Sequence, residues 1–259
     1  MGVEVFPSVF VSHGAPTLII ERNETVEFLK GLGEELGRPR AILCVSAHWE
    51  TRVPTLSAAE RPETIHDFGG FPEELYRMRY DAPGAPELAA RACELLKAAG
   101  HSCELSPGRG LDHGAWVPLS LMYPAADIPV TQLSVQPHAG PAAHVRVGRA
   151  LEPLRREGVL VLASGGAVHN LSTFRRATTT PDWAARFDEW LHEKLTAGAF
   201  EDVIDYRALS AEARAAHPTE EHLLPLFVAL GAGGAAARVR PLHRGFTHGS
   251  FSMAAYAFG

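Results

Sequence analysis

Cysteine is scarce in this sequence of 259 residues, which contains only Cys44, Cys93 and Cys103 and no Cys-x-x-Cys pair. An odd number of cysteines without paired spacing argues against a disulfide framework and against a zinc site made of thiolates. The first residues also lack the basic segment and the apolar stretch of a secretory signal peptide. We therefore expect reduced cysteines and a cytoplasmic location.

Positive charge is not in excess, and no long apolar run occurs. The sequence has 24 Lys and Arg residues against 30 Asp and Glu residues, a formal net charge of -6. Nucleic acids and anionic membrane surfaces attract basic patches, and the sequence has no cluster of Lys and Arg. No apolar run approaches the roughly 20 residues that a membrane-spanning helix needs. These absences predict a protein that binds neither nucleic acid nor membrane, and they leave a homo-oligomer open.

Several common catalytic motifs are also absent. The sequence contains no Gly-x-Ser-x-Gly nucleophile elbow, which disfavours a serine hydrolase. It contains no His-Glu-x-x-His motif, which weakens the case for a zinc hydrolase. The stretch Ser164-Gly165-Gly166 does not match the spacing of a dinucleotide-binding or phosphate-binding loop, so we interpret it as a tight turn after a strand.

Apolar runs of strand length alternate with amphipathic segments, which is the pattern of an α/β protein. Residues 9–12, 41–45 and 159–164 are nearly all apolar, as expected of strands buried on both faces. Residues 24–36 carry apolar side chains at helical spacing, so a β–α–β unit with parallel strands is expected. Other helices are predicted for residues 86–99, 113–122, 142–156, 182–195 and 218–230, and other strands for 101–105, 129–135, 239–242 and 250–257. The sequence therefore predicts a single α/β domain over residues 1–259, with a central, mostly parallel sheet flanked by helices.

Histidine is abundant, with 13 copies, and several stand at the ends of predicted elements. His13, His48 and His169 follow predicted buried strands, and open α/β sheets bind ligands at the carboxyl ends of such strands. His113 opens a predicted helix, and His222 lies in the first turn of another. Neutral imidazole is a common ligand of Zn and Fe(II), so the grouping predicts a metal site or a catalytic pair. Each of these histidines taken singly also has a structural interpretation.

Carboxylates near these histidines offer further ligands. Asp67, Glu220 and Glu221 are candidates, although acids in the first turn of a helix also interact favourably with the helix dipole. The remaining histidines are predicted to lie on surfaces or in loops: His66, His101, His138, His144, His192, His217, His243 and His248.

Six short motifs that contain these residues follow one another along nearly the whole chain. They are SHGAP (12–16), SAHW (46–49), IHDFGGFP (65–72), LDHGAW (111–116), VHNL (168–171) and PTEEH (218–222). Together they strongly resemble the class III extradiol ring-cleavage dioxygenases of the LigB superfamily, and most of all its branch of 4,5-DOPA extradiol dioxygenase-like proteins. The resemblance implies an enzyme that opens the ring of a catechol with O2 and yields a semialdehyde.

The resemblance also implies a metal site. His13, His48 and His222 are similar to the three metal ligands of this branch. Fe(II) is the metal expected for activity, and Zn(II) is an alternative because three histidines suit it equally well. The broader superfamily has a glutamate as its third ligand, so ligation by Glu220 or Glu221 stays open.

Two further histidines are similar to catalytic residues of the same superfamily. His169 matches the acid–base histidine, which can also approach the metal when substrate is absent, and His113 matches a second active-site histidine. These roles make chemical sense, because a facial site with three ligands leaves positions for both catechol oxygens and for O2. A nearby imidazole can then accept a proton from the catechol.

The segment 62–86 is predicted to be an ordered loop that borders the pocket, because it is long, aromatic and without helical or strand periodicity. Its residues His66, Phe68, Phe71 and Tyr80 are candidates for contact with the substrate ring or its side chain. A packed structural loop is the alternative for each of them.

Two other functions compete with ring cleavage. A zinc-dependent hydrolase would use the same histidines to activate water. A non-catalytic binding protein similar to the Memo proteins would share the fold, although the presence of both His113 and His169 favours catalysis.

Overall fold

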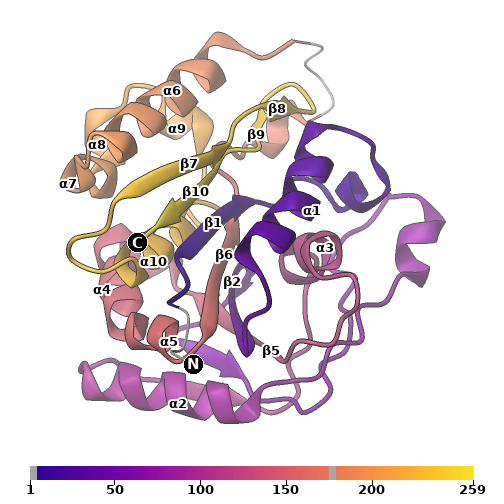
Figure 1. Ribbon diagram of the computed structural model, residues 1–259. Coiled ribbons are helices and arrows are strands. Elements are labelled where there is room, and N and C mark those ends of the chain that lie inside the picture. The colour runs from indigo at the N-terminus through magenta and orange to yellow at the C-terminus, as the bar shows by residue number, and fades with distance from the viewer. Residues whose placement is uncertain (1–4, 175–178) are drawn as a thin grey trace.

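An eight-stranded sheet lies at the centre of the computed structural model, which describes residues 5–174 and 179–259 (Figure 1). Residues 1–4, part of the N-terminal stretch considered above, lie outside the described residues. The strands are β1 (Ser8–Ser12), β2 (Ala41–Glu50), β3 (Thr55–Ser57), β4 (Glu104–Ser106), β5 (Val130–Val135), β6 (Val159–Gly165), β7 (Val239–His243), β8 (Phe246–Thr247), β9 (Phe251–Ser252) and β10 (Ala255–Phe258). The order in the large sheet is β4-β3-β5-β2-β6-β1-β10-β7, and β8 pairs with β9 separately.

The strands that lead to the candidate histidines are parallel neighbours. β6 pairs in parallel with β1 on one side and with β2 on the other, and β2 pairs in parallel with β5. Antiparallel pairs occur further out, between β1 and β10, between β10 and β7, and between β3 and β5. The prediction of a single α/β domain with a central, mostly parallel sheet is confirmed.

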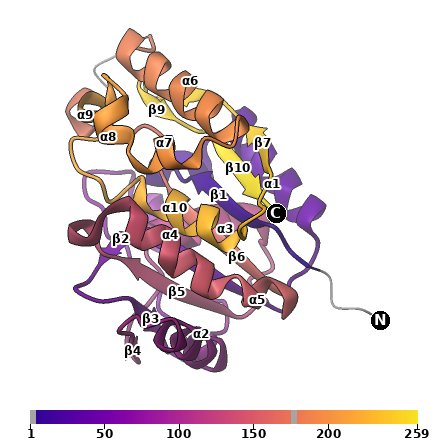
Figure 2. The ribbon, with the colours of Figure 1, turned by 90° about the vertical axis from the view of Figure 1, so that its left-hand side faces the viewer.

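Helices cover both faces of this sheet (Figures 1 and 2). Helices α1 (Glu24–Leu36) and α3 (His113–Met122) lie on one face, and α4 (Gly140–Leu151) and α10 (Leu224–Ala232) lie on the other. The other helices are α2 (Pro86–Ala98), α5 (Pro153–Arg156), α6 (Asp182–Thr196), α7 (Phe200–Ile204), α8 (Tyr206–Leu209) and α9 (Ala213–Ala216), with short 3-10 turns η1 (Pro16–Ile20), η2 (Glu73–Arg77), η3 (Pro137–Ala139) and η4 (Leu171–Thr173). Within the described ranges, no helix has the length and apolar character needed to cross a membrane.

Side chains alternate along each strand between two apolar clusters, one on each face of the sheet. In β1, Val9 and Val11 pack into the cluster that contains α1 and α3, whereas Phe10 packs into the cluster that contains α4 and α10. In β2, the neighbours Ile42 and Leu43 belong to opposite clusters in the same way. Successive side chains of a strand point to opposite faces, so a strand covered on both sides must be apolar throughout. This is why these strands are continuous apolar runs in the sequence.

The helix predicted for residues 218–230 begins later than its sequence pattern indicates. Residues 218–223 form turns, and α10 starts at Leu224 with Pro225 in its first turn, where the missing N–H costs no helical hydrogen bond. His222 therefore precedes the helix instead of lying in its first turn. The short strand β3 lies in a stretch where the sequence pattern predicts no element.

Two histidines predicted to lie on surfaces or in loops are buried. The ring of His144 donates from Nδ1 to the carbonyl of Gly140 at 2.7 Å, and His217 Nε2 bonds the carbonyl of Ala167 at 2.9 Å. A buried imidazole is stable when it has such a partner. Their roles are structural, because they tie helix ends and turns to the chain around them.

The expectation of three reduced cysteines is wrong. Cys93, near the end of α2, and Cys103, just before β4, form a disulfide with their Cα atoms 5.5 Å apart. The tight turn after α2 brings the two residues together, although the sequence has no spacing that indicates it. Cys44 is a free, buried cysteine in β2.

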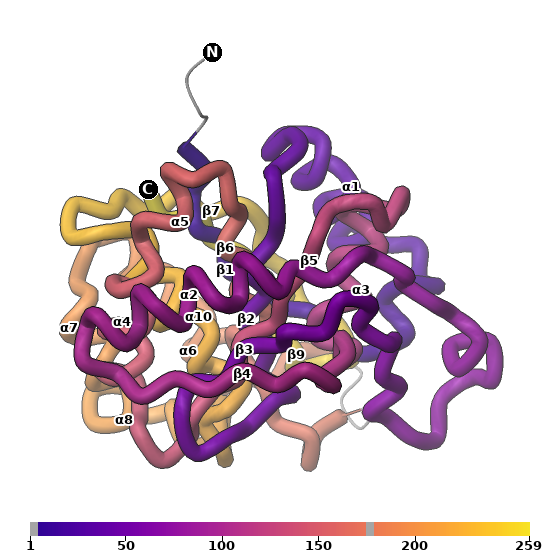
Figure 3. Tube along the Cα trace, turned by 90° about the horizontal axis from the view of Figure 1, so that it is seen from below, coloured from indigo at the N-terminus to yellow at the C-terminus, as the bar shows by residue number. Residues whose placement is uncertain are grey.

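The segment 62–86 is the ordered loop that the sequence predicts. Its regular structure is limited to η2, an isolated bridge between Thr64 and Leu111, and another between Gly84 and Val130. In Figure 3 the purple trace between β3 and α2 forms the right-hand edge of the molecule. The loop therefore wraps the side of the sheet that carries α3, and it places its aromatic residues next to that helix.

Candidate metal centre

Three histidines from separate elements meet at the carboxyl edge of the parallel strands. His13 follows β1 directly, His48 lies within the last residues of β2 instead of beyond its end, and His222 lies in the turn before α10. Gly165, at the end of β6, lets this turn approach the sheet. The backbone N–H of Gly166 donates to the carbonyl of His222 at 2.8 Å, and a Cβ on Gly165 would overlap that carbonyl oxygen. The backbone thus holds His222 against the strands that carry the other two histidines.

The Nε2 atoms of these three rings are close together. His48 Nε2 lies 2.9 Å from His13 Nε2 and 3.3 Å from His222 Nε2. Two nitrogens bound to one tetrahedral metal at about 2.0–2.1 Å lie roughly 3.3–3.4 Å apart. The spacing of the three rings is therefore close to that of histidines around a single ion.

The other ring nitrogen of His13 faces a hydroxyl. His13 Nδ1 lies 3.0 Å from Ser164 Oγ, and that hydroxyl donates its own hydrogen to the carbonyl of Gly114. The Ser164 oxygen must therefore accept from His13 Nδ1–H, because a hydroxyl has one hydrogen to give. This tautomer leaves a lone pair on His13 Nε2, the form that a metal ligand requires.

The two glutamates before His222 have different partners. Glu221 Oε1 lies 2.9 Å from His222 Nδ1, whereas Glu220 Oε1 accepts from Arg207 Nε at 2.6 Å and from the Tyr206 hydroxyl at 3.1 Å. A carboxylate only accepts hydrogen bonds, so Glu221 places the ring hydrogen of His222 on Nδ1. The lone pair on His222 Nε2 then faces the other histidines.

Asp67 contacts two histidines at once. Its Oδ2 lies 3.4 Å from His48 Nδ1, and its Oδ1 lies 3.0 Å from His113 Nδ1 and accepts from the backbone N–H of His113 at 2.9 Å. Burial raises the pKa of Asp67, but its interactions with His113 outweigh burial and lower that pKa to about 2. Asp67 is therefore ionised at neutral pH and faces both imidazoles.

Burial keeps the clustered imidazoles uncharged. Removal from water, followed by repulsion from the neighbouring histidines, holds the pKa of His13 and of His222 well below the ordinary value of 6.5. Burial also lowers the pKa of His48 to about 3. Neutral imidazole is the form that binds a metal, so this group is ready to bind one at neutral pH.

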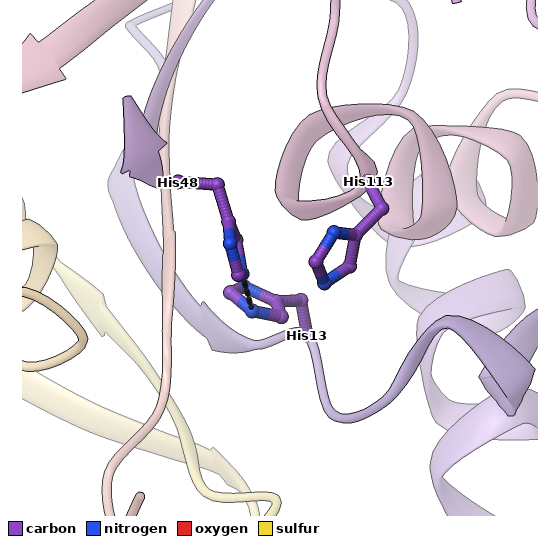
Figure 4. Close-up of side chains that lie close together, drawn as sticks. All are labelled: His13, His48 and His113. Carbon is purple, nitrogen blue, oxygen red and sulfur yellow. Dashed lines mark hydrogen bonds between the residues drawn. The ribbon is translucent and has the colours of Figure 1, made fainter. Parts of the chain in front are cut away.

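His113 joins the same group from the first turn of α3. Figure 4 shows its ring facing His13 and His48, and its ring centroid lies 3.9 Å from that of His48 and 5.4 Å from that of His13. Ring nitrogens of His13, His48 and His113 lie within 4.8 Å of one another, a cluster that can hold a metal ion. His169, Glu221 and His222 form a second group of described residues that could hold an ion, and His222 Nε2 also lies 3.3 Å from His48 Nε2 of the first group.

His169 reaches the cluster from the turn after β6. Its ring stacks on that of His222, with centroids 3.4 Å apart and planes inclined by 7°. Its backbone N–H donates to the carbonyl of Ala216 at 3.0 Å, and the side chain of Asn170 donates to the carbonyl of Ala215 at 2.7 Å. Burial, with smaller contributions from the nearby histidines, lowers the pKa of His169 to about 3. A neutral imidazole is thereby available beside the cluster.

A cavity of about 200 Å³ opens onto the five histidines. Phe68 and Phe71 of the loop 62–86 line it, as the sequence predicts for substrate-contacting residues. His66 and Tyr80 are not among the described residues that line it: His66 Nε2 bonds the carbonyl of Met78, and the Tyr80 hydroxyl donates to the carbonyl of Tyr123, directly after α3. The other apolar lining residues are Ala15, Pro16, Leu171, Phe174 and Phe251.

Sequence reasoning missed a buried polar network behind the histidines. Asp112, directly before His113, is fully buried and accepts hydrogen bonds from Ser46 at 2.6 Å, from Arg109 at 2.6 Å and from Gln132. The available signal was its place in the motif LDHGAW, where an acid precedes a candidate catalytic residue. The network fixes the start of α3, and therefore the position of His113.

Comparison with known proteins agrees with this arrangement. The family model described as the catalytic LigB subunit of aromatic ring-opening dioxygenase matches residues 7–259. The "4,5-DOPA dioxygenase extradiol" of Portulaca grandiflora is 46% identical over 97% of this chain and 95% of its own length. The protein of the same name from Escherichia coli K12 is 41% identical over 98% of this chain and 94% of its own length.

A solved structure supports the same assignment. The crystal structure of an uncharacterized protein from Escherichia coli K12 matches with a TM-score of 0.84 and 36% sequence identity, and the match covers 98% of this chain and 100% of that one. Family match, close relatives and fold thus agree over nearly the full length. The chain belongs to the LigB family of extradiol, aromatic ring-opening dioxygenases.

Proposed function

We propose that the chain opens the ring of a catechol-type substrate with O2 and releases a semialdehyde, with a metal held by His13, His48 and His222. One observation carries the proposal: the Nε2 atoms of three histidines converge, at 2.9 and 3.3 Å, beside an aromatic-lined cavity. A single cation bound by these nitrogens would account for the convergence. Relatives named 4,5-DOPA dioxygenase extradiol support a catechol as the substrate class.

The donor set fits Fe(II), and it also fits Zn(II). All three donors are neutral imidazole nitrogens, which both ions accept. His222 is proposed as the third ligand because its Nε2 lies 3.3 Å from His48 Nε2 and because its motif resembles that of a family ligand. His113, whose ring nitrogen groups with those of His13 and His48, is the competing third ligand. Bound Fe(II) would lower the pKa of the catechol hydroxyls. It would also supply the redox chemistry with O2 that zinc lacks.

The cavity is proposed to orient the substrate ring. Phe68 and Phe71 come from the loop 62–86, and Phe251 comes from β9. Aromatic side chains prefer edge-to-face or offset contacts with another ring, so they hold a planar substrate at a defined tilt. A volume of about 200 Å³ suits a single ring with a short substituent. The same apolar walls exclude water from the reacting hydroxyls.

His169 and His113 are proposed to move protons. Both rings line the cavity, and neither is needed to complete the three-histidine set above. His169 is neutral at neutral pH because burial lowers its pKa, so it can accept a proton from a catechol hydroxyl and return it later in the reaction. His113 has Asp67 on its Nδ1 side, which leaves its Nε2 free for the substrate.

The metal assignment is tested by comparing His222→Ala with His113→Ala. Apo proteins would be reconstituted anaerobically with Fe(II), and bound metal would be measured before any substrate is added. We expect His222→Ala to lose more affinity than the roughly 10–100-fold typical of residues that only support a ligand, and His113→Ala to keep its metal. His138→Ala, at an exposed histidine, is the matched control. If His222→Ala keeps its metal and His113→Ala loses it, His113 and not His222 is the third ligand.

The reaction is tested with an oxygen electrode and a panel of catechols. The Fe(II) form should consume O2 in proportion to the catechol and give a ring-opened product, and the Zn(II) form should not. A zinc hydrolase would show no such uptake and would cleave ester or amide substrates instead. A binding protein similar to the Memo proteins would do neither. Absence of uptake with every catechol, in a protein shown to hold Fe(II), would contradict the proposal.

A further inference from the structure

We propose that Asp67 is a positioning residue that sets the tautomers of His48 and His113 together. The inference rests on the proposed metal site, since it assigns His48 as a ligand and His113 as a group that faces substrate. The carboxylate of Asp67 is the shared partner of both rings, at 3.4 Å from His48 Nδ1 and 3.0 Å from His113 Nδ1. It thus links one residue that holds the metal to one that meets the substrate.

The two oxygens of Asp67 are not equivalent. Oδ1 accepts the backbone N–H of His113 at 2.9 Å, at the first residue of α3, where helical N–H groups have no partner within the helix. That N–H can only donate, so the atom at the Oδ1 position must be an acceptor. Oδ2 is free of this constraint and faces His48 Nδ1.

Each contact favours one position for the ring hydrogen. Both are close N–O contacts and not well-aligned hydrogen bonds, but a lone pair on Nδ1 would be repelled by the ionised carboxylate, so His48 and His113 favour a hydrogen on Nδ1 and a lone pair on Nε2. For His48 this lone pair faces His13 Nε2 and His222 Nε2, 2.9 and 3.3 Å away. In water the opposite tautomer of a neutral imidazole is also populated, and in that form His48 cannot bind a metal through Nε2.

Direct ligation of a metal by Asp67, which the sequence left open, is not favoured by this geometry. Both oxygens lie on the Nδ1 side of His48 and His113, away from the Nε2 atoms that converge. The groups of described residues that could hold an ion do not include Asp67. A purely structural role remains the alternative, in which Asp67 only fastens the loop 62–86 to the start of α3.

The substitution Asp67→Asn separates these roles. The backbone N–H of His113 keeps the amide oxygen at the Oδ1 position, so the amide NH2 takes the Oδ2 position and points its hydrogens at His48 Nδ1. His48 should switch to the Nε2–H tautomer, while His113 keeps its own. Asp67→Ala should instead leave both imidazole rings without a preferred tautomer. We therefore expect the isosteric Asn variant to lose more metal affinity than the Ala variant.

Two measurements, neither of which requires turnover, test this. Long-range 1H–15N spectra of the metal-free protein report the tautomer of each imidazole, assigned with single His→Gln variants. Competition with a chelating dye gives the affinity for Zn²⁺, the probe ion. Partners that orient a metal-binding histidine are typically worth about 10–100-fold in affinity, and we expect a loss of this size in Asp67→Asn. Asp127→Asn, at an exposed acid paired with Arg38, is the matched control and should behave as wild type.

The results separate this inference from the proposed function. A change of tautomer at His48 alone, with Asn more damaging than Ala, supports the positioning role even if no catechol is cleaved. Unchanged tautomers, or an Ala variant that loses more Zn²⁺ affinity than the Asn variant, would overturn it and leave Asp67 as a structural fastener. Failure of wild-type protein to cleave any catechol would overturn the proposed function, and it would not alter the ranking of the two variants in Zn²⁺ binding.

Discussion

Replacement of Gly165 by alanine should displace His222. Gly165 ends β6 beneath the turn that carries His222, and a Cβ at this position would overlap the carbonyl oxygen of His222. Ordinary contact between a methyl group and another heavy atom needs about 3.5 Å, so the turn must retreat by on the order of 1 Å. The same retreat would strain the 2.8 Å hydrogen bond from Gly166 N–H to that carbonyl.

The expected cost follows from overpacking of a buried position. Extra methyl groups in a well-packed interior typically cost about 1–3 kcal/mol of unfolding free energy. For a chain of this size, about 1 kcal/mol corresponds to roughly 2–4 °C in Tm, so a drop of about 2–12 °C is expected. Metal affinity should fall as well, because His222 Nε2 lies only 3.3 Å from His48 Nε2 and a displacement of this size would move it out of ligand range.

Gly166→Ala provides the matched control one residue away. The nearest atom to a Cβ at Gly166 is the Cβ of His169, at 3.4 Å, which is ordinary contact, and neither glycine has a positive φ that would strain an alanine. Urea unfolding of the metal-free proteins gives the stability, and Zn²⁺ competition gives the affinity. If Gly165→Ala and Gly166→Ala behave alike in both measurements, the close approach of His222 to β6 is not what fixes its position.

Three further changes probe catalysis, acid stability and the disulfide. His169→Ala should retain full metal stoichiometry and lower catechol-dependent O2 uptake by ~10²–10⁴-fold; loss of metal would make His169 a ligand instead. Burial lowers the pKa of His144 from 6.5 to about 4, so the unfolded chain binds a proton that the folded chain does not, and the free energy of unfolding should fall as pH drops from about 6.5 to about 4. His144→Gln should remove up to about 3 kcal/mol of that fall in urea titrations at several pH values, and an unchanged pH dependence would show that His144 does not contribute. The Cys93–Cys103 disulfide spans a separation of 10 residues, so its reduction should cost about 2–3 kcal/mol of unfolding free energy. Zn²⁺ affinity should not change; a parallel loss of affinity would show that this edge of the sheet supports the site.

The sheet and the meeting of the histidines could be predicted because both follow from local pattern. Val9–Val11 and Ile42–Leu43 are apolar whichever face they point to, so the strands are visible as unbroken runs. Parallel strands end at one edge, so histidines that follow them must converge there. His113 and His222 were the exceptions among the candidates, because neither follows a parallel strand: His113 begins α3, and His222 lies in the turns before α10. Only the resemblance to known motifs indicated their places.

The partners of these histidines could not be predicted, because they depend on where neighbouring side chains turn. Glu220 and Glu221 are adjacent and chemically alike, yet one binds Arg207 and the other binds His222. The buried histidine His144 and the bonded cysteines were missed for a related reason. Cys103 precedes β4 and bonds Cys93 within α2, and His144 bonds Gly140 at the start of its own helix. The disulfide and the burial of His144 depend on how these elements pack, and no periodicity in the sequence indicates them.

The residues that orient the clustered histidines come from several separate segments of the chain. Ser164 shows this clearly: its hydroxyl accepts from His13 Nδ1 at 3.0 Å and donates to the carbonyl of Gly114, so one side chain on β6 connects β1 to the first turn of α3. Each of the three histidines proposed as metal ligands faces such a group on its Nδ1 side, and each group comes from a different segment. The three Nε2 lone pairs therefore converge only when the whole edge of the sheet is folded, because no single motif supplies both a ligand and the group that fixes its tautomer at every position. The histidines can be found in the sequence, but the directions in which they bind depend on the fold.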